Sequence, residues 1–256
     1  MKLLNVEAHL HWGYSVKVPN TGKAQPSLNI PPPSTLIGAI SLPIAKHRGT
    51  GETFVDEGKL IGVADLYRPI FKAAACRLIG KATYSEDINR YIIALFQNSA
   101  RRFKQEYRFN AIPAGKVYGP NQKIRMVYLV DENSALQILG EDWHAEIESA
   151  AYQISRIGSK ESIVSVENVK LSDANTVGGK VSTSLYFPFE FAEVVNGGEF
   201  FFADFWLPSY ALGKRPQMVR YIVPASRAPI IESSILQVNV KTSAYTNGED
   251  TIIAGS

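Results

Sequence analysis

Cysteine is almost absent from this chain of 256 residues, which contains only Cys76. A lone cysteine cannot form a disulfide within the chain, and such usage is typical of the reducing cytoplasm. Cys76 lies in the apolar run IFKAAACRLIG, so we expect a small buried side chain there rather than a nucleophile. Every apolar run is interrupted well before the roughly 20 residues that a membrane-spanning helix needs. The N-terminal stretch MKLLNVEAHLHWG turns polar too soon for a signal peptide. We therefore expect a cytoplasmic protein.

Familiar metal and catalytic motifs are missing as well. The histidines are His9, His11, His47 and His144. His9 and His11 share one face of an expected strand, but no cysteine or acid completes a familiar ligand spacing around them. The phosphate-binding loop GxxxxGK[ST], a strand followed by GxGxxG, and the nucleophile motif GxSxG do not occur. We expect no metal ion, no cofactor and no catalytic residue. A metal-independent ribonuclease using His9, His11 or Tyr14 stays open as the alternative.

What the chain does contain is enough apolar sequence for a folded core. Hydrophobic residues make up 45% and aromatic residues 11%, so most of the chain is expected to be ordered. The length suits one large domain or two smaller ones.

Positive charge is concentrated in one region. The net charge of the whole chain is only +3. Residues 81–125 hold nine Lys/Arg and three acids, which gives +6 there and leaves −3 for the rest. We call residues 81–125 the basic island. Its lysines and arginines alternate with aromatic residues between 101 and 118, a pattern typical of binding to unpaired nucleic acid. A solvated helix face is the alternative. The phosphate-pairing candidates are Arg101, Arg102, Lys104, Arg108 and Lys116.

The stretch NIPPPSTLIGAI predicts a rigid start to a short helix. Pro31 to Pro33 favour extended backbone, and Ser34 or Thr35 can cap a helix that runs to about residue 46. Pro43 is expected to kink or end this helix.

The stretch RIGSKES, residues 156–162, has two interpretations. Gly158 can simply end the preceding helix. Alternatively, Arg156, Ser159 and Lys160 surround a turn whose backbone N–H groups bind an anion. The sequence leaves both open.

The order of elements suggests a ferredoxin-like α+β domain in residues 1–170, because strand–helix–strand occurs there twice. The spacing of Ile88, Ile92 and Leu95 predicts a helix within the basic island. A smaller β-rich subdomain is expected in residues 171–256, with a frayed tail after residue 243.

Three stretches carry a family resemblance: HLHWGYSVKVP, PPPSTLIGAI and RIGSKESIVSV. In this order they resemble the Cas5 family of CRISPR-associated proteins, which belongs to the RAMP superfamily. The resemblance covers roughly residues 1–170. It is closest to the form found in type I-A interference complexes.

The resemblance implies a non-catalytic subunit of a Cascade complex in antiviral defence. Family members carry an RRM-like domain with a thumb-like insertion, which would fall at about residues 83–116 here. They hold the 5′ repeat-derived handle of the CRISPR RNA and cap the filament of backbone subunits (Cas7). They also contact the large subunit.

The implied RNA contacts fall on residues already singled out. The resemblance assigns handle or backbone-subunit contact to the candidates of the basic island, and handle contact to Arg156, Ser159 and Lys160. It also places Ser34 and Thr35 at a helix N-terminus that faces a phosphate. One branch of the family, in type I-C systems, cuts precursor RNA with a Tyr, a Lys and an adjacent His. Here Val117 follows Lys116, and this departure argues against cleavage.

Overall fold

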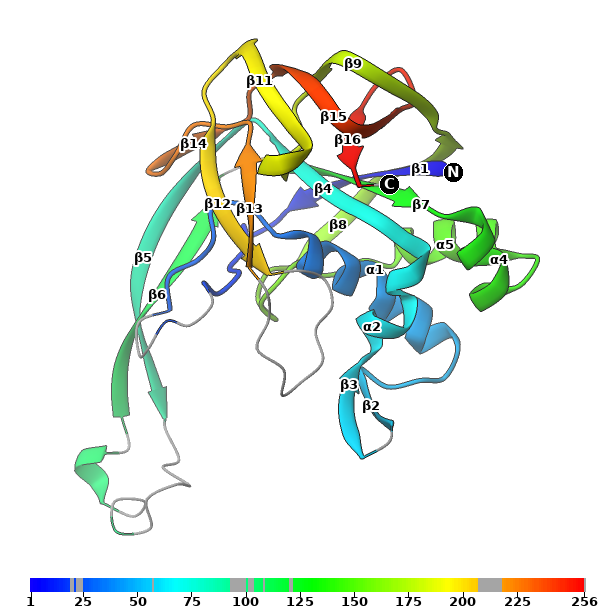
Figure 1. Cartoon of the computed structure of the whole chain (residues 1–256). Helices are drawn as coiled ribbons and strands as arrows, with labels where there is room; N and C mark the ends of the chain where they lie inside the picture. Colours follow the sequence, from blue (N-terminus) through cyan, green and yellow to red (C-terminus); the bar gives the residue numbers. More distant parts are fainter. Residues whose placement is uncertain are drawn as a thin grey trace.

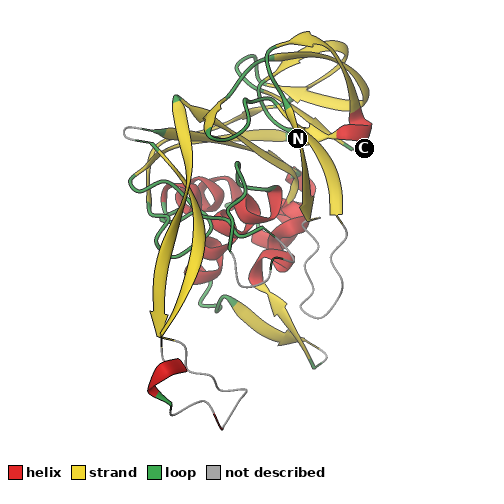
Figure 2. Cartoon of the chain, turned by 90° about the vertical axis from the view of Figure 1, so that its left-hand side faces the viewer, coloured by secondary structure: helices red, strands yellow, loops and turns green. Residues whose placement is uncertain are grey.

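The computed structural model describes residues 1–18, 21, 25–56, 58–92, 100, 104–107, 109–119, 122–206 and 218–255. At its centre lies a four-stranded antiparallel sheet with the strand order β4-β7-β1-β8 (Figure 1). Its strands are β1 (Lys2–Leu10), β4 (Phe71–Ile79), β7 (Lys123–Val130) and β8 (Val164–Asp173). Helices α1 (Pro33–His47), α4 (Glu132–Leu139) and α5 (Trp143–Tyr152) lie together on one side of this sheet (Figure 1 and Figure 2). The expected mixture of helices with mostly antiparallel strands is confirmed.

The alternating sequence of β1 explains how the sheet carries a core on its helical side. Leu4, Val6 and Ala8 are fully buried in the same cluster as the apolar residues of α1. Asn5 and Glu7 point to the opposite face, because successive side chains of a strand alternate. Among the helices that the structure describes, none has the length and apolar character needed to cross a membrane.

Helix α1 begins one residue earlier than the sequence suggested. Pro32 is the N-cap residue and Pro33 is the first helical residue, and no side chain caps the helix. Proline suits the first position because its φ is already helical and its missing N–H would be unpaired there. The prediction that Ser34 or Thr35 caps the helix was therefore wrong. The helix continues through Pro43 to His47, close to the expected end at about residue 46, so Pro43 does not end it.

Three buried tyrosines hold the proline stretch in place. The Tyr186 hydroxyl donates to the carbonyl of Pro31 at 2.9 Å, and the Tyr128 hydroxyl donates to the carbonyl of Leu36 at 3.0 Å. Tyr14 donates in the same way to the carbonyl of Asn29. Burial raises the pKa of all three phenols. They therefore act as neutral donors that fix the start of α1 against the sheet.

The basic island contains a long hairpin that extends away from the body (Figure 1). Its strands are β5 (Lys81–Ile92) and β6 (Phe109–Tyr118), and β14 (Ile230–Glu232) pairs with the base of β5. The predicted helix at Ile88 and Ile92 was wrong, because both residues lie in β5. A spacing of four puts residues on one face of a helix and equally on one face of a strand. Leu95 lies outside the described residues.

Two further sheets are built from strands that follow β8. One contains β9 (Asn175–Thr183), β11 (Ala192–Gly197), β15 (Leu236–Thr246) and β16 (Thr251–Ala254). The other contains β10 (Phe187–Pro188), β12 (Phe201–Trp206) and β13 (Met218–Val223). Figure 1 shows β9, β15 and β16 on the side of the central sheet away from the helices. A hairpin of β2 (Thr53–Asp56) and β3 (Lys59–Gly62), with helix α2 (Val63–Tyr67), precedes β4.

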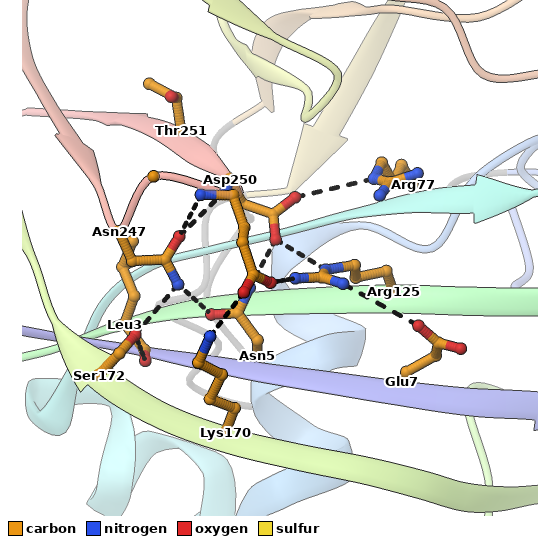
Figure 3. A network of polar contacts seen from close by, with 12 residues as sticks. Leu3, Asn5, Glu7, Arg77, Arg125, Lys170, Ser172, Asn247, Asp250 and Thr251 are labelled. Atoms are coloured by element: carbon orange, nitrogen blue, oxygen red, sulfur yellow. Dashed lines mark hydrogen bonds and ion pairs between the residues drawn. The ribbon is translucent and has the colours of Figure 1, made fainter.

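The C-terminal tail is tied to the central sheet, so the expectation that it frays was wrong. The turn between β15 and β16 inserts Asp250 between two arginines of the sheet (Figure 3). Asp250 Oδ2 lies 2.7 Å from Nε of Arg125, and Oδ1 lies 3.7 Å from Nε of Arg77. Asn5 donates to the same carboxylate, whose side chain is only 2% exposed.

Neighbouring residues extend this ion-pair network. Glu249 accepts hydrogen bonds from Lys170 and Arg125, which hold the pKa of its carboxyl below its usual value. The Asn247 side chain donates to Asn5 and to Ser172 of β8. The turn thereby contacts β1, β4, β7 and β8 at once.

We predict that Asp250→Ala lowers the free energy of unfolding by about 3 kcal/mol, because it leaves two arginines without their buried carboxylate. Asp204→Ala is the matched control, since it breaks an exposed pair with Arg220 and is expected to cost little. Chemical denaturation of the full chain measures both. Equal losses for the two variants would contradict a stabilising role for the buried network.

Candidate nucleic-acid interface

Two groups of candidate RNA-binding residues, Lys116 and those of the loop of residues 156–162, border the backbone that follows β1. We call residues 11–18 the seam segment. On one side it pairs with β6: Tyr14 N–H donates to the carbonyl of Val117 at 2.8 Å, and Val117 N–H donates back at 2.9 Å. On its other side Ser159 N–H donates to the carbonyl of Ser15 at 3.0 Å. The seam segment therefore joins the base of the β5–β6 hairpin to the loop of residues 156–162.

Glycines allow this close backbone packing. A Cβ atom on Gly13 would lie 2.0 Å from the carbonyl oxygen of Val117. One on Gly115 would lie 2.3 Å from the backbone nitrogen of Ser27, and one on Gly158 would lie 2.6 Å from the carbonyl oxygen of Ser15. Real Cβ atoms do not approach so closely, so each side of the seam segment needs a residue without a side chain.

Gly158 therefore has a role that neither sequence interpretation described. Helix α5 ends at Tyr152 with Gln153 as its C-cap, so Gly158 is not a helix cap. Its φ of +85° and its contact with Ser15 show that it brings the loop against the chain itself. The N–H groups of Ile157, Ser159 and Ser162 already donate to carbonyls. An anion at this loop would have to use other N–H groups than these three, and the predicted nest stays a prediction.

The side chains of the loop divide into structural and exposed ones. Ser162 is buried, accepts from Ser15 N–H at 3.0 Å and lies 2.8 Å from the hydroxyl of Ser159. Ser159 is therefore partly engaged within the protein. Lys160 is exposed. Arg156 donates to the carboxylate of Glu52 at 2.7 Å, so a phosphate at Arg156 must compete with that pair.

Arg156 and Thr35 line one groove of about 390 Å³ between α1, β3 and the loop. Ser34 lines a neighbouring groove of about 380 Å³ together with Lys17. Few N–H groups of α1 are free for a phosphate, however. Pro33 has none, and those of Thr35 and Leu36 both donate to the carbonyl of Pro32. The helix N-terminus is therefore a poorer anion site than the sequence suggested.

The basic island is divided by the structure. Lys116 lies in β6 next to the seam segment, and its Nζ is 6.0 Å from the ring centroid of Trp12. Lys104 lies beside a short 3-10 helix (Gln105–Tyr107) near the far end of the hairpin (Figure 1). Lys116 is thus brought together with the loop of residues 156–162, and Lys104 is not. Arg101, Arg102 and Arg108 lie outside the described residues.

The residues considered for the alternative ribonuclease function, Tyr14, His9 and His11, differ in burial and in their contacts. Tyr14 is completely buried, its hydroxyl is bonded to Asn29, and burial raises its pKa well above the usual value. It cannot reach a substrate as a base. His11 Nε2 lies 2.6 Å from the Ser165 hydroxyl, and its ring meets that of His9 edge to face at 5.1 Å. Within the described ranges, no group of three or more His, Cys, Asp or Glu side chains is placed to hold a metal ion.

Sequence reasoning missed one exposed residue of this region, Trp12. It lies in the seam segment, and its side chain is 70% exposed. A large aromatic residue just after an alternating strand and before a glycine was the available signal.

We predict that Gly158→Ala destabilises the protein more than Gly80→Ala does. Both glycines have a positive φ, +85° at Gly158 and +90° at Gly80, so an alanine at either position is strained by about 1 kcal/mol. Only at Gly158 does the new methyl group meet backbone, since nothing lies within 4 Å of a Cβ on Gly80. We expect about 2 kcal/mol of additional loss for Gly158→Ala in chemical denaturation. Equal losses would show that the close contact with Ser15 is unimportant.

Comparison with known proteins gives a consistent family. Residues 15–185 match the family described as "CRISPR-associated protein (Cas_Cas5)". The chain is 37% identical over 242 residues to CRISPR-associated protein Cas5 3 of Saccharolobus solfataricus, and 38% identical over 243 residues to CRISPR system aCascade subunit Cas5 1 of the same organism. Each alignment covers 94% of both proteins.

A solved structure shares the fold. A CRISPR protein from Archaeoglobus fulgidus superposes over 100% of both chains with a TM-score of 0.64 and 23% sequence identity. The sequence matches reach well beyond the stretches that first suggested the resemblance. The chain belongs to the Cas5 family of CRISPR-associated proteins.

Proposed function

We propose that this chain is a non-catalytic RNA-binding subunit of a type I-A Cascade complex. In this proposal it holds the 5′ repeat-derived handle of the CRISPR RNA and caps the filament of Cas7 backbone subunits. A relative with 38% identity is named as an aCascade subunit, which supports membership in such a complex. The observation that carries RNA binding is that Lys116 and the loop residues Arg156, Ser159 and Lys160 flank the same seam segment.

The chemistry of this surface suits a phosphate backbone. Lysine and arginine pair with phosphates, and serine hydroxyls donate hydrogen bonds to them. Lys17 and Lys160 are exposed, and Lys116 is half-exposed. Arg101, Arg102, Lys104 and Arg108 remain candidates for a second contact, to the handle or to the backbone subunit. Ser34 and Thr35 remain candidates beside the groove that Arg156 lines.

The topology supports the RRM-like part of the proposal. The order β4-β7-β1-β8, with α1 after β1 and with α4 and α5 after β7, is the connectivity expected of a ferredoxin-like sheet. The β5–β6 hairpin is our candidate for the thumb at residues 83–116. We also propose the division into residues 1–170 and 171–256, because the central sheet ends with β8 and strands β9 to β13, β15 and β16 form two other sheets.

An exposed aromatic cluster supports a protein contact within the complex, with Cas7 or the large subunit. The rings of Phe189 and Phe202 meet edge to face at 5.7 Å, and those of Phe200 and Phe202 at 5.8 Å. All three side chains are exposed. Contiguous apolar surface of this kind marks interaction sites.

We predict that Lys160→Glu weakens binding of repeat-derived RNA and lowers the salt dependence of affinity. A lost phosphate contact on a single strand reduces the slope of log K against log salt by about 0.7. Lys180→Glu is the matched control, because Lys180 is exposed on β9 in a different sheet. Native gels with end-labelled RNA and no divalent metal, run at several salt concentrations, give affinity and slope. Denaturing gels of the same samples report cleavage.

Three outcomes are distinguishable. A shift with intact RNA that Lys160→Glu alone weakens supports the proposal. Equal affinity of the two variants refutes the loop as a contact. Cleavage of the RNA refutes the non-catalytic assignment and directs attention to His9 and His11, since Tyr14 is inaccessible.

A further inference from the structure

Trp12 is displayed on a fixed piece of backbone. His11 N–H donates to the carbonyl of Ile163, and Tyr14 N–H donates to the carbonyl of Val117. Gly13, between them, has a φ of +72° and packs directly on β6. Trp12 is thus held from both sides while its indole remains 70% exposed. By contrast, the side chain of Trp143 is buried in the core and only 4% exposed.

The surroundings of the indole are aromatic and positively charged. The Nζ atom of Lys116 lies 6.0 Å from the ring centroid, which is the outer limit of a cation–π contact. Lys116 therefore leaves most of the ring free. Tyr118, on the same strand, is also exposed, and its Cβ is 2.5 Å from where a Cβ of Gly13 would lie. Two aromatic rings and an ammonium group therefore project from adjacent backbone.

This arrangement matches the chemistry of an unpaired nucleotide. A free aromatic face stacks on a base of any identity, and a nearby lysine pairs with the phosphate. A tryptophan can also anchor a protein partner. The cation beside the ring, and the position of Trp12 in the segment that joins β6 to the loop of residues 156–162, favour the nucleic acid.

We propose that Trp12 forms a stacking site for one unpaired nucleobase of a single-stranded RNA, with Lys116 pairing with the adjoining phosphate. The proposal rests on the RNA-binding function proposed above and adds to it a site for a base. The stacking contact of Trp12 is uncharged, so salt dependence separates it from the phosphate contacts, that of Lys116 included.

The test compares Trp12→Ala, Trp12→Phe and the control Tyr152→Ala in the full chain, with repeat-derived RNA as the probe. Tyr152 is an exposed aromatic residue of helix α5 to which no contact is assigned. We expect Trp12→Ala to weaken binding about tenfold or more without changing the salt slope, because stacking involves no charge. Trp12→Phe should retain most of the affinity, and Tyr152→Ala all of it. Unchanged melting temperatures verify folding.

RNAs with one abasic nucleotide at successive positions locate the stacked base. At one position, the abasic RNA should weaken binding to the unsubstituted protein about as much as Trp12→Ala does, and should add little further loss in that variant. Full additivity at every position overturns the stacking site. So does equal RNA affinity of Trp12→Ala and the unsubstituted protein, while RNA binding itself survives. Loss of subunit assembly with unchanged RNA affinity would assign Trp12 to a protein contact instead. If the unsubstituted protein binds no RNA, alone or with the backbone subunit, the proposed function fails together with this site.

Discussion

The backbone hydrogen bonds of the three residues Tyr14 to Val16 hold the candidate interface together. Through them the chain after β1 is joined to β6 on one side and to the loop of residues 156–162 on the other. The Ser27 hydroxyl and Leu28 N–H bond to Val16, which adds a third partner. These partners are separated from the seam segment by up to about 145 positions in the sequence. Charged side chains from distant parts of the chain are thereby brought to one place.

Two sets of buried polar contacts stabilise the elements around this interface. The tyrosine hydroxyls at Pro31 and Leu36 fix the start of α1, whose Thr35 lines the groove beside the loop. On the opposite face of the sheet, Asp250 ties the C-terminal strands to Arg125 and Arg77. In both sets, each buried polar group has a specific hydrogen-bond or ion-pair partner. Because a different packing of the elements would leave these groups unpaired, they favour a single arrangement.

The sequence was sufficient where the signal was local. Alternation identified β1, and the prolines identified a rigid lead into a helix. The error at Ser34 arose because a proline can occupy the first helical position itself, so the start moved back to Pro33. The error at Ile88 arose because a four-residue spacing fits both a helix and a strand.

Non-local partners explain the remaining errors. The tail looked frayed because its anchors, Arg77 and Arg125, lie more than 120 residues away. The role of Gly158 could not be predicted from the sequence, because it depends on close packing against Ser15, which is distant in the chain. The contact roles assigned to the site residues stay predictions. The structure adds that Lys116 and the loop of residues 156–162 border the same seam segment, that Lys104 lies elsewhere, and that Trp12 was overlooked.

The central claim is that RNA lies across the seam segment, between the base of the β5–β6 hairpin and the loop of residues 156–162. Ultraviolet cross-linking of repeat-derived RNA to the full chain, with mass spectrometry of the linked peptides, tests it most directly. We expect cross-links in peptides that contain Trp12, Lys116 or Lys160. Cross-links confined to β9, β11 and β15, on the other side of the central sheet, would contradict it.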